Sequence, residues 1–151
     1  TGEVWKIQPE PEDAEFVSHE FWLSNGEDVG FHGRSATGDP IFGVTRYDNA
    51  NQWRTVIEPD VNHIHANTRD LAVGDASGDI QSVVLYDVRG KAVTSRELAV
   101  HDCTSHVQGL HVHPRIALDG TSVAFTSDRL GYGNVYLAEI PDDLSTLPGL
   151  K

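Results

Sequence analysis

Imidazole and amide side chains gather in the stretch HVQGLHVHPR, residues 106–115. It holds three of the eight histidines of the chain, together with a glutamine at position 108. Neutral imidazoles and an amide oxygen are ligands that suit a borderline divalent ion such as manganese, iron, nickel or zinc. A surface cluster and packing inside a core are the alternatives. Which of the three applies depends on where similar histidines recur along the chain.

Three histidines, His19, His63 and His113, stand at the same point of an internal repeat. The segments that begin there are HEFWLSNGEDVGFHG, HIHANTRDLAVGDAS and HPRIALDGTSVAFTS. In each, a turn pair follows six and seven residues after the histidine, and a valine follows ten residues after it. The three starts lie 44 and 50 residues apart. A period of about 40 to 50 residues with about four strands in each unit is typical of β-propeller blades.

Short apolar or β-branched runs, separated by turn residues, cover most of the chain, and helical periodicity is nearly absent. We therefore expect an all-β protein. Strands are expected at EVWKI (3–7), DVGFHG (28–33), IFGVTRY (41–47), QWRTVIE (52–58), DLAVGD (70–75), SVVLYDV (82–88), RELAVH (96–101), SVAFTS (122–127) and NVYLAEI (134–140).

The repeat predicts one partial β-propeller domain over residues 1–151, with about three blades. We expect a partial blade at 1–17 and blades that start near residues 19, 63 and 113. Because a closed propeller needs about four to eight blades, the chain is expected to be a piece of a longer protein or to pair with copies of itself. The N-terminal run TGEVWKI reads as the middle of a strand, and the final DDLSTLPGLK reads as a fraying tail.

Acidic side chains dominate the charge. The chain has 23 acidic and 11 basic residues, and its net charge is −12. Nucleic acid and anionic membrane surfaces are not expected as partners, because both would be repelled. No apolar run approaches the ~18 residues of a membrane span. The single cysteine, Cys103, excludes a disulfide within the chain.

Equivalent repeat positions of a propeller face the same mouth of the central channel, because the innermost strand of every blade begins there. His19, His63 and His113 are therefore expected to lie close together. His111 joins them, because side chains two positions apart on a strand project to the same side. Gln108 lies within reach of His111 through a turn. The histidines that are expected to be structural are His32, His101 and His106.

These stretches resemble the oligogalacturonate lyases, a family of seven-bladed propellers that cleave pectin-derived oligouronides. The similar stretches are HEFWLSNG (19–26), NHIHANTRDLAVGD (62–75), QGLHVHPR (108–115) and LDGTSVAFTSDRLGYGNVYLAEIP (118–141). The last also resembles generic propeller repeats of the TolB type, so it indicates the fold and not the activity. The resemblance spans nearly all of the chain but only about the C-terminal half of a family member.

The resemblance implies a manganese site and a general base. In the family, Mn²⁺ is held by one histidine of one blade and by the glutamine and two histidines of a Q-x-x-H-x-H run. In this chain these are His63, Gln108, His111 and His113. The base proposed for the family lies in a stretch similar to HEFW, and the resemblance implies that His19 is that base in this chain. The sequence departs from the family at Val107, where a basic residue that helps to bind substrate is expected, and in lacking the earlier blades.

The implied reaction is β-elimination on an oligogalacturonate, which leaves a 4,5-unsaturated uronate. A Lewis-acidic metal would stabilise the charge that develops when the C5 proton is removed, and an imidazole with a pKa near ~6.5 would accept that proton. Arg34, Arg115 and Arg129 are candidates for pairing with substrate carboxylates; for each, a solvated surface arginine is the alternative. The resemblance also implies a cytoplasmic location.

Two other functions remain open at this point. A non-catalytic propeller module, such as a binding scaffold of the TolB kind, would need no metal at the channel mouth. A degenerate piece of a lyase would keep the metal ligands by descent and turn over no substrate. Substrate length and the identity of the metal are not encoded in these patterns.

Overall fold

Three antiparallel sheets follow one another along the chain in the computed structural model, which describes residues 2–7 and 16–150. The first sheet consists of β1 (Phe16–Trp22), β2 (Asp28–Arg34), β3 (Pro40–Arg46) and β4 (Gln52–Val56). The second consists of β5 (Val61–Ala66), β6 (Leu71–Ala76), β7 (Ser82–Asp87) and β8 (Thr94–Val100). The third consists of β9 (Arg115–Ile116), β10 (Ser122–Ser127) and β11 (Asn134–Glu139). The all-β fold expected from the sequence is confirmed.

Helix is confined to two single turns in the described part of the chain. They are the 3₁₀-helices η1 (Gln108–Leu110) and η2 (Leu144–Thr146). Neither has the length or the apolar character that a membrane crossing requires.

Within each sheet, every strand pairs with the next strand along the chain, so every sheet is a meander. The side chain of Asn25 closes the turn between β1 and β2, because its Oδ1 accepts hydrogen bonds of 3.0 Å from the backbone N–H groups of Glu27 and Asp28. Gly26 in the same turn has a φ of 69°, and Gly120 in the turn before β10 has a φ of 76°. Glycine adopts this left-handed conformation without a steric penalty.

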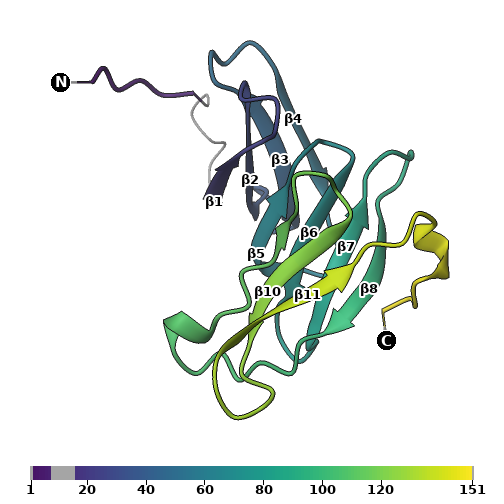
Figure 1. Ribbon diagram of the computed structural model, residues 1–151. Coiled ribbons are helices and arrows are strands. Elements are labelled where there is room, and N and C mark those ends of the chain that lie inside the picture. The colour runs from purple at the N-terminus through teal and green to yellow at the C-terminus, as the bar shows by residue number, and fades with distance from the viewer. Residues whose placement is uncertain (1, 8–15, 151) are drawn as a thin grey trace.

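The second sheet lies between the other two and is buried on both faces (Figure 1). Successive side chains of a strand point to opposite faces. Along β7, Val84 and Tyr86 therefore pack toward the first sheet, while Val83 and Leu85 pack toward the third. This arrangement explains why the run SVVLYD is apolar at nearly every position and not at alternate ones.

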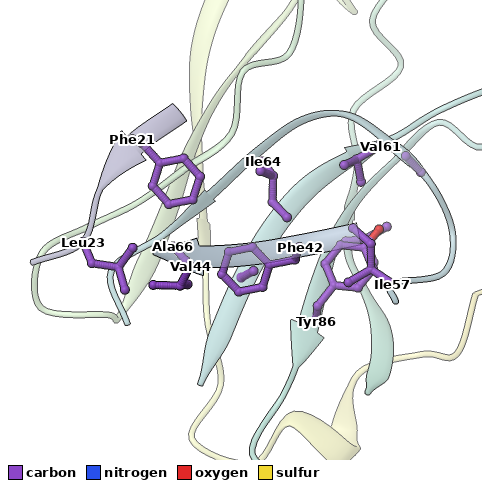
Figure 2. Packing of buried hydrophobic residues seen from close by; sticks show 12 residues of the cluster. Phe21, Leu23, Phe42, Val44, Ile57, Val61, Ile64, Ala66 and Tyr86 are labelled. Atoms are coloured by element: carbon purple, nitrogen blue, oxygen red, sulfur yellow. The ribbon is translucent and has the colours of Figure 1, made fainter. Parts of the chain in front are cut away.

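The core between the first two sheets is built mainly from side chains of β1, β3, β5, β6 and β7 (Figure 2). Phe42 at its centre is fully buried, and its ring meets that of Trp53 edge to face at a centroid distance of 5.7 Å. The hydroxyl of buried Tyr86 donates a 2.8 Å hydrogen bond to the carbonyl of Pro59. The one polar group of that ring is thus satisfied.

The third sheet is covered on one face only within the described residues. Along β11, Val135 and Leu137 are each 75% exposed, whereas Tyr136 and Ala138 pack into the core shared with the second sheet. Two apolar side chains on the outer face of β11 are therefore open to solvent.

The expected strand at 3–7 is wrong. Residues 2–7 have no regular secondary structure, and residues 8–15 lie outside the described part of the chain. The run EVWKI resembles β7 and β11, which each pair with the strand that precedes them. None of the described strands pairs with residues 3–7, so the segment is held by isolated contacts. Trp5 donates to the carbonyl of Tyr47, and Thr45 donates to that of Ile7.

The reading of the C-terminal residues as a fraying tail is also wrong for those that the structure describes. Leu144 and Leu147 pack against the core between the second and third sheets, and Leu150 packs against the other core. The carbonyl of Pro148 accepts a 3.0 Å hydrogen bond from the backbone N–H of Glu97 on β8. The apolar leucines of the tail, spaced three apart, dock it beside the second sheet.

Phe42→Ala should strongly destabilise the fold, because it removes a fully buried ring between two sheets. We expect the free energy of unfolding to fall by about 3–5 kcal/mol, measured by urea denaturation. Leu137→Ala is the control; its side chain is mostly exposed, and its effect should stay within about 0.5 kcal/mol. Equal midpoints for the two variants would contradict the packing described here.

Candidate metal centre

The strands that carry the repeated histidines are neighbours in space. β5 contacts both β1 and β9. His19 lies on β1 and His63 on β5, and His113 lies two residues before β9. Because the sheets pack face to face, the first strand of each lies against the first strand of the next. Equivalent repeat positions are thereby brought together.

Three imidazoles converge at this point: His63, His111 and His113. One nitrogen from each lies within 4.8 Å of the corresponding nitrogens of the other two. The ring centroids of His63 and His113 are 3.9 Å apart, and that of His111 is 5.4 Å from His63. His111 and His113 come from the same short segment after η1, whereas His63 comes from a different sheet. The cluster is therefore assembled by the packing of two sheets.

The three nitrogens could hold a single metal ion. When two imidazole nitrogens bind one ion at ~2.1 Å each, they lie about 3–4 Å apart. The limit of 4.8 Å on the spacing here is slightly longer than this range. A neutral imidazole offers one nitrogen lone pair and carries no charge. Lone pairs that face one another need a cation or a hydrogen-bond donor between them.

Asp75 holds the ring of His63 in a fixed orientation. Its Oδ2 lies 2.9 Å from His63 Nδ1, and its Oδ1 accepts a 2.6 Å hydrogen bond from the backbone N–H of His63. Asp75 is only 3% exposed, on β6, directly across the hairpin from His63. A carboxylate on one ring nitrogen fixes the tautomer and leaves the other nitrogen free for a metal. His63 thus has the orientation of a metal ligand.

Unusual backbone marks the same positions. His19 and His113 have φ values of 54° and 44°, a conformation uncommon for residues other than glycine. The pairing of β1 with β2 shifts between Ser18 and Phe21, and that of β5 with β6 shifts between Val61 and His63. Such bulges redirect side chains and occur often near active sites. Residues in this conformation each cost on the order of 1–3 kcal/mol, which the surrounding packing must offset.

A cavity of about 450 Å³ opens beside the cluster. His63 and His111 line it, and so do Gln108 from η1 and His19 from β1. The ring of His19 meets that of His63 at a centroid distance of 5.0 Å. His113 does not line this cavity but a smaller one that His19 and His63 also line, and its ring contacts that of His63. The structure thus brings together all five residues expected at the site.

Burial, and then a neighbouring imidazole, lowers the pKa of two of these histidines. Partial burial lowers the pKa of His19, and the neighbouring His63 lowers it further, whereas Asp75 and Glu20 raise it. The pKa of His113 is lowered by the same two causes, with burial again the larger. The neutral form is the one that binds a metal or accepts a proton, so both rings are available for either role near neutral pH.

Of the three expected arginines, Arg115 lines a cavity that the histidines also line. Arg115 contributes to the smaller cavity, beside His113 and His19. Arg34 instead forms an ion pair with Asp60. Arg129 pairs with Asp102 at 2.9 Å, in the connection that follows the second sheet. Arg115 is therefore the arginine best placed to meet a ligand of the site.

Three further histidines have local partners. His65 Nδ1 accepts from the backbone N–H of Ile116, and burial, followed by Arg115, lowers its pKa to about 4. Buried His101 accepts from the N–H of Cys103, and exposed His106 bonds the hydroxyl of Thr104. These contacts are structural.

Sequence reasoning missed several residues at the site. His32 was assigned no part in it, yet its Nδ1 lies 3.1 Å from His19 Nδ1. Asp75 was not singled out, and neither were two polar residues that line the larger cavity, Asn62 and Ser105. The signal that could have identified Asp75 is its position opposite His63 in the β5–β6 hairpin.

The sequence matches no described protein family and no curated protein. Among solved structures, the chain is similar to an oligogalacturonate lyase from Vibrio parahaemolyticus, with a TM-score of 0.81 and 22% identity. It is also similar to an oligogalacturonate lyase in complex with manganese, with a TM-score of 0.80 and 22% identity. The chain has the fold of part of these lyases. The fold that the sequence resemblance implied is thus confirmed.

The similarity covers nearly all of this chain but a minor part of the two lyases. The matches span 95% and 94% of this chain and 40% and 39% of the solved structures. The chain therefore corresponds to about two fifths of a lyase chain, somewhat less than the half expected from the sequence.

Asp75→Asn should weaken metal binding. The amide replaces one of the two accepting oxygens with an NH₂ group that can only donate, so one of the two contacts that Asp75 makes with His63 is lost. We expect the dissociation constant for Mn²⁺, measured by calorimetry, to rise about 10–100-fold. Asp28→Asn is the control, since this carboxylate is also buried and accepts from Asn25 and Arg69 away from the cavity. An unchanged constant in Asp75→Asn would show that the contact does not orient a ligand.

Proposed function

We propose that this chain carries the metal-binding and proton-accepting part of a lyase that acts on oligogalacturonate. One observation carries the proposal: three imidazoles that can share an ion lie beside a cavity that is also lined by a separate imidazole, His19. Similarity to two solved oligogalacturonate lyases supports the choice of reaction. Further blades, from a longer chain or from other copies, would complete the substrate groove.

The proposed ligands of the divalent ion are His63, Gln108, His111 and His113. The imidazole and amide donors, and the manganese bound by one lyase of similar fold, favour Mn²⁺. When bound, the ion supplies Lewis-acid stabilisation of the negative charge that develops on a uronate carboxylate. These ligands carry no charge of their own. The site therefore retains a positive charge within an acidic protein and attracts an anionic sugar.

His19 is the proposed general base. Its ring is exposed to the cavity, and its lowered pKa leaves it neutral and able to accept the C5 proton of the uronate. The electrons of the C5–H bond form the C4–C5 double bond, and the C4–O4 bond breaks. O4 departs with the electron pair and is protonated from water. The products are a 4,5-unsaturated uronate and a shortened oligosaccharide.

The substrate in this proposal is a short, pectin-derived acidic oligosaccharide, which the resemblance places in the cytoplasm. Its repeating carboxylates require positive groups beyond the ion. Arg115 lines the cavity that adjoins the cluster, and its guanidinium matches a carboxylate in shape and charge. We assign this arginine to a neighbouring sugar unit.

His19→Ala should strongly slow the elimination and leave the metal in place. The variant removes the base but none of the proposed ligands. We expect the Mn²⁺-loaded chain to form unsaturated product from oligogalacturonate, detected by its ultraviolet absorbance, and the rate in the variant to fall by about 10²–10⁴-fold. His106→Ala, in which an exposed histidine bonded to Thr104 is removed, should retain the parent rate.

Metal bound by the unaltered chain with no unsaturated product would contradict the proposed activity. The chain would then be a piece that keeps the ligands without turnover. If the chain binds no metal, and if His63→Ala leaves its fold unchanged, the chain would instead be a non-catalytic propeller module.

A further inference from the structure

A second histidine lies behind the proposed base. His32 is on β2 and is only 7% exposed, whereas His19 faces the cavity. Their Nδ1 atoms are 3.1 Å apart and within hydrogen-bonding geometry. The two rings are nearly parallel, with an interplanar angle of 15° and a centroid distance of 5.1 Å. This distance suits two rings joined edge to edge by one hydrogen bond better than two rings in face-to-face contact.

Exactly one proton can occupy the space between these two nitrogens. Two lone pairs would repel each other at this distance, and two N–H groups would clash. Each neutral imidazole carries one proton, on either of its nitrogens. The hydrogen bond therefore couples the tautomers of the two rings: the ring that donates through Nδ1 has a bare Nε2, and the ring that accepts has its proton on Nε2.

The direction of this bond decides whether His19 can act as a base. If His19 donates, its Nε2 carries a lone pair and can accept a proton. If His19 accepts, its Nε2 is already protonated. Once His19 has taken a proton on Nε2 it holds one on both nitrogens, so it can then only donate to His32. If His32 already accepts from His19 Nδ1, His19 can be protonated on Nε2 without any rearrangement of this hydrogen bond.

The surroundings of His32 favour a neutral ring, which is the form that can accept a hydrogen bond. Burial, and then the neighbouring His19, lowers the pKa of His32, which favours its neutral form; Asp60 and Asp75 act in the opposite sense and more weakly than burial. Its backbone pairs with β1 at Ser18 and with β3 at Phe42, so the ring cannot swing away with a mobile loop. His19 follows Ser18 at the bulge of β1, where its positive φ turns it toward the same ring.

We propose that His32 is a positioning residue that accepts a hydrogen bond from His19 Nδ1 and thereby keeps His19 Nε2 free to take a proton. This inference rests on the proposed role of His19 as the base. It assigns to His32 the function that a carboxylate performs behind the histidine of many hydrolytic sites. The acceptor here is a neutral ring, so the pair adds no negative charge beside an anionic substrate.

The tautomer of His19 is measured directly by nitrogen-15 NMR on the full chain labelled at histidine. The measurement needs neither substrate nor turnover. In the parent chain we expect the proton of His19 on Nδ1. His32→Asn should preserve it, because Oδ1 of asparagine lies near the position of Nδ1 and also accepts. His32→Leu offers no acceptor and should shift the proton toward Nε2.

Elimination kinetics give the second readout. His32→Leu should lower kcat about tenfold or more with little change in KM, and His32→Asn should recover most of the loss. His101→Asn is the control for removing a buried histidine; it keeps an acceptor for the N–H of Cys103 and should change neither readout. Circular dichroism verifies that each variant is folded.

A His19 proton found on Nε2 in the parent chain would overturn the inference, and so would a His19 tautomer that stays the same in His32→Leu. If the NMR result is as expected but no unsaturated product forms in the parent chain, the hydrogen-bonded pair stands and the proposed lyase activity fails. The two failures are therefore distinguishable.

Discussion

The site depends on the burial of the second sheet on both faces. Apolar side chains on either side of β6 and β7 require a sheet on each side, and the first and third sheets meet this requirement. The packing brings β1, β5 and the segment before β9 side by side. Four imidazoles, from the first two sheets and from the segment that leads into the third, then share one region although their positions span 95 residues of the chain. Local sequence alone could not assemble such a cluster, because each sheet contributes only part of it.

Within this framework, hydrogen bonds and unusual backbone conformations fix the individual rings. Buried Asp75 holds one nitrogen of His63 and directs the other outward, and His32 stands in the corresponding place behind His19. Positive φ values at His19 and His113 carry a conformational cost that the packed sheets offset. The feature that the three units share is therefore the repeat position itself, which is turned toward the same point in each. In the first two units a neighbouring polar group also restrains the ring there.

The repeat and the apolar runs predict most of the sheets and the histidine cluster, but not the groups behind it. Runs such as SVVLYDV identify strands because both faces are buried. EVWKI has an equally good pattern and forms no strand, since pattern does not supply a pairing partner. Asp75 escapes sequence reasoning because the other two units have Phe31 and Phe125 at the matching distance from their histidines. The pairing of β5 with β6 also shifts between Val61 and His63, so the residue opposite His63 cannot be found by counting forward from Val61 with a regular register.

The central claim is that these histidines form a metal centre, and metal content tests it most directly. The chain is purified without a His-tag, loaded with Mn²⁺ and freed of excess, and its metal is measured beside that of His111→Ala and His106→Ala. We predict about one ion per chain in the parent chain and in His106→Ala, and loss of the ion in His111→Ala. No metal in the parent chain, or equal metal in all three proteins, would contradict the account and return the histidines to structural roles.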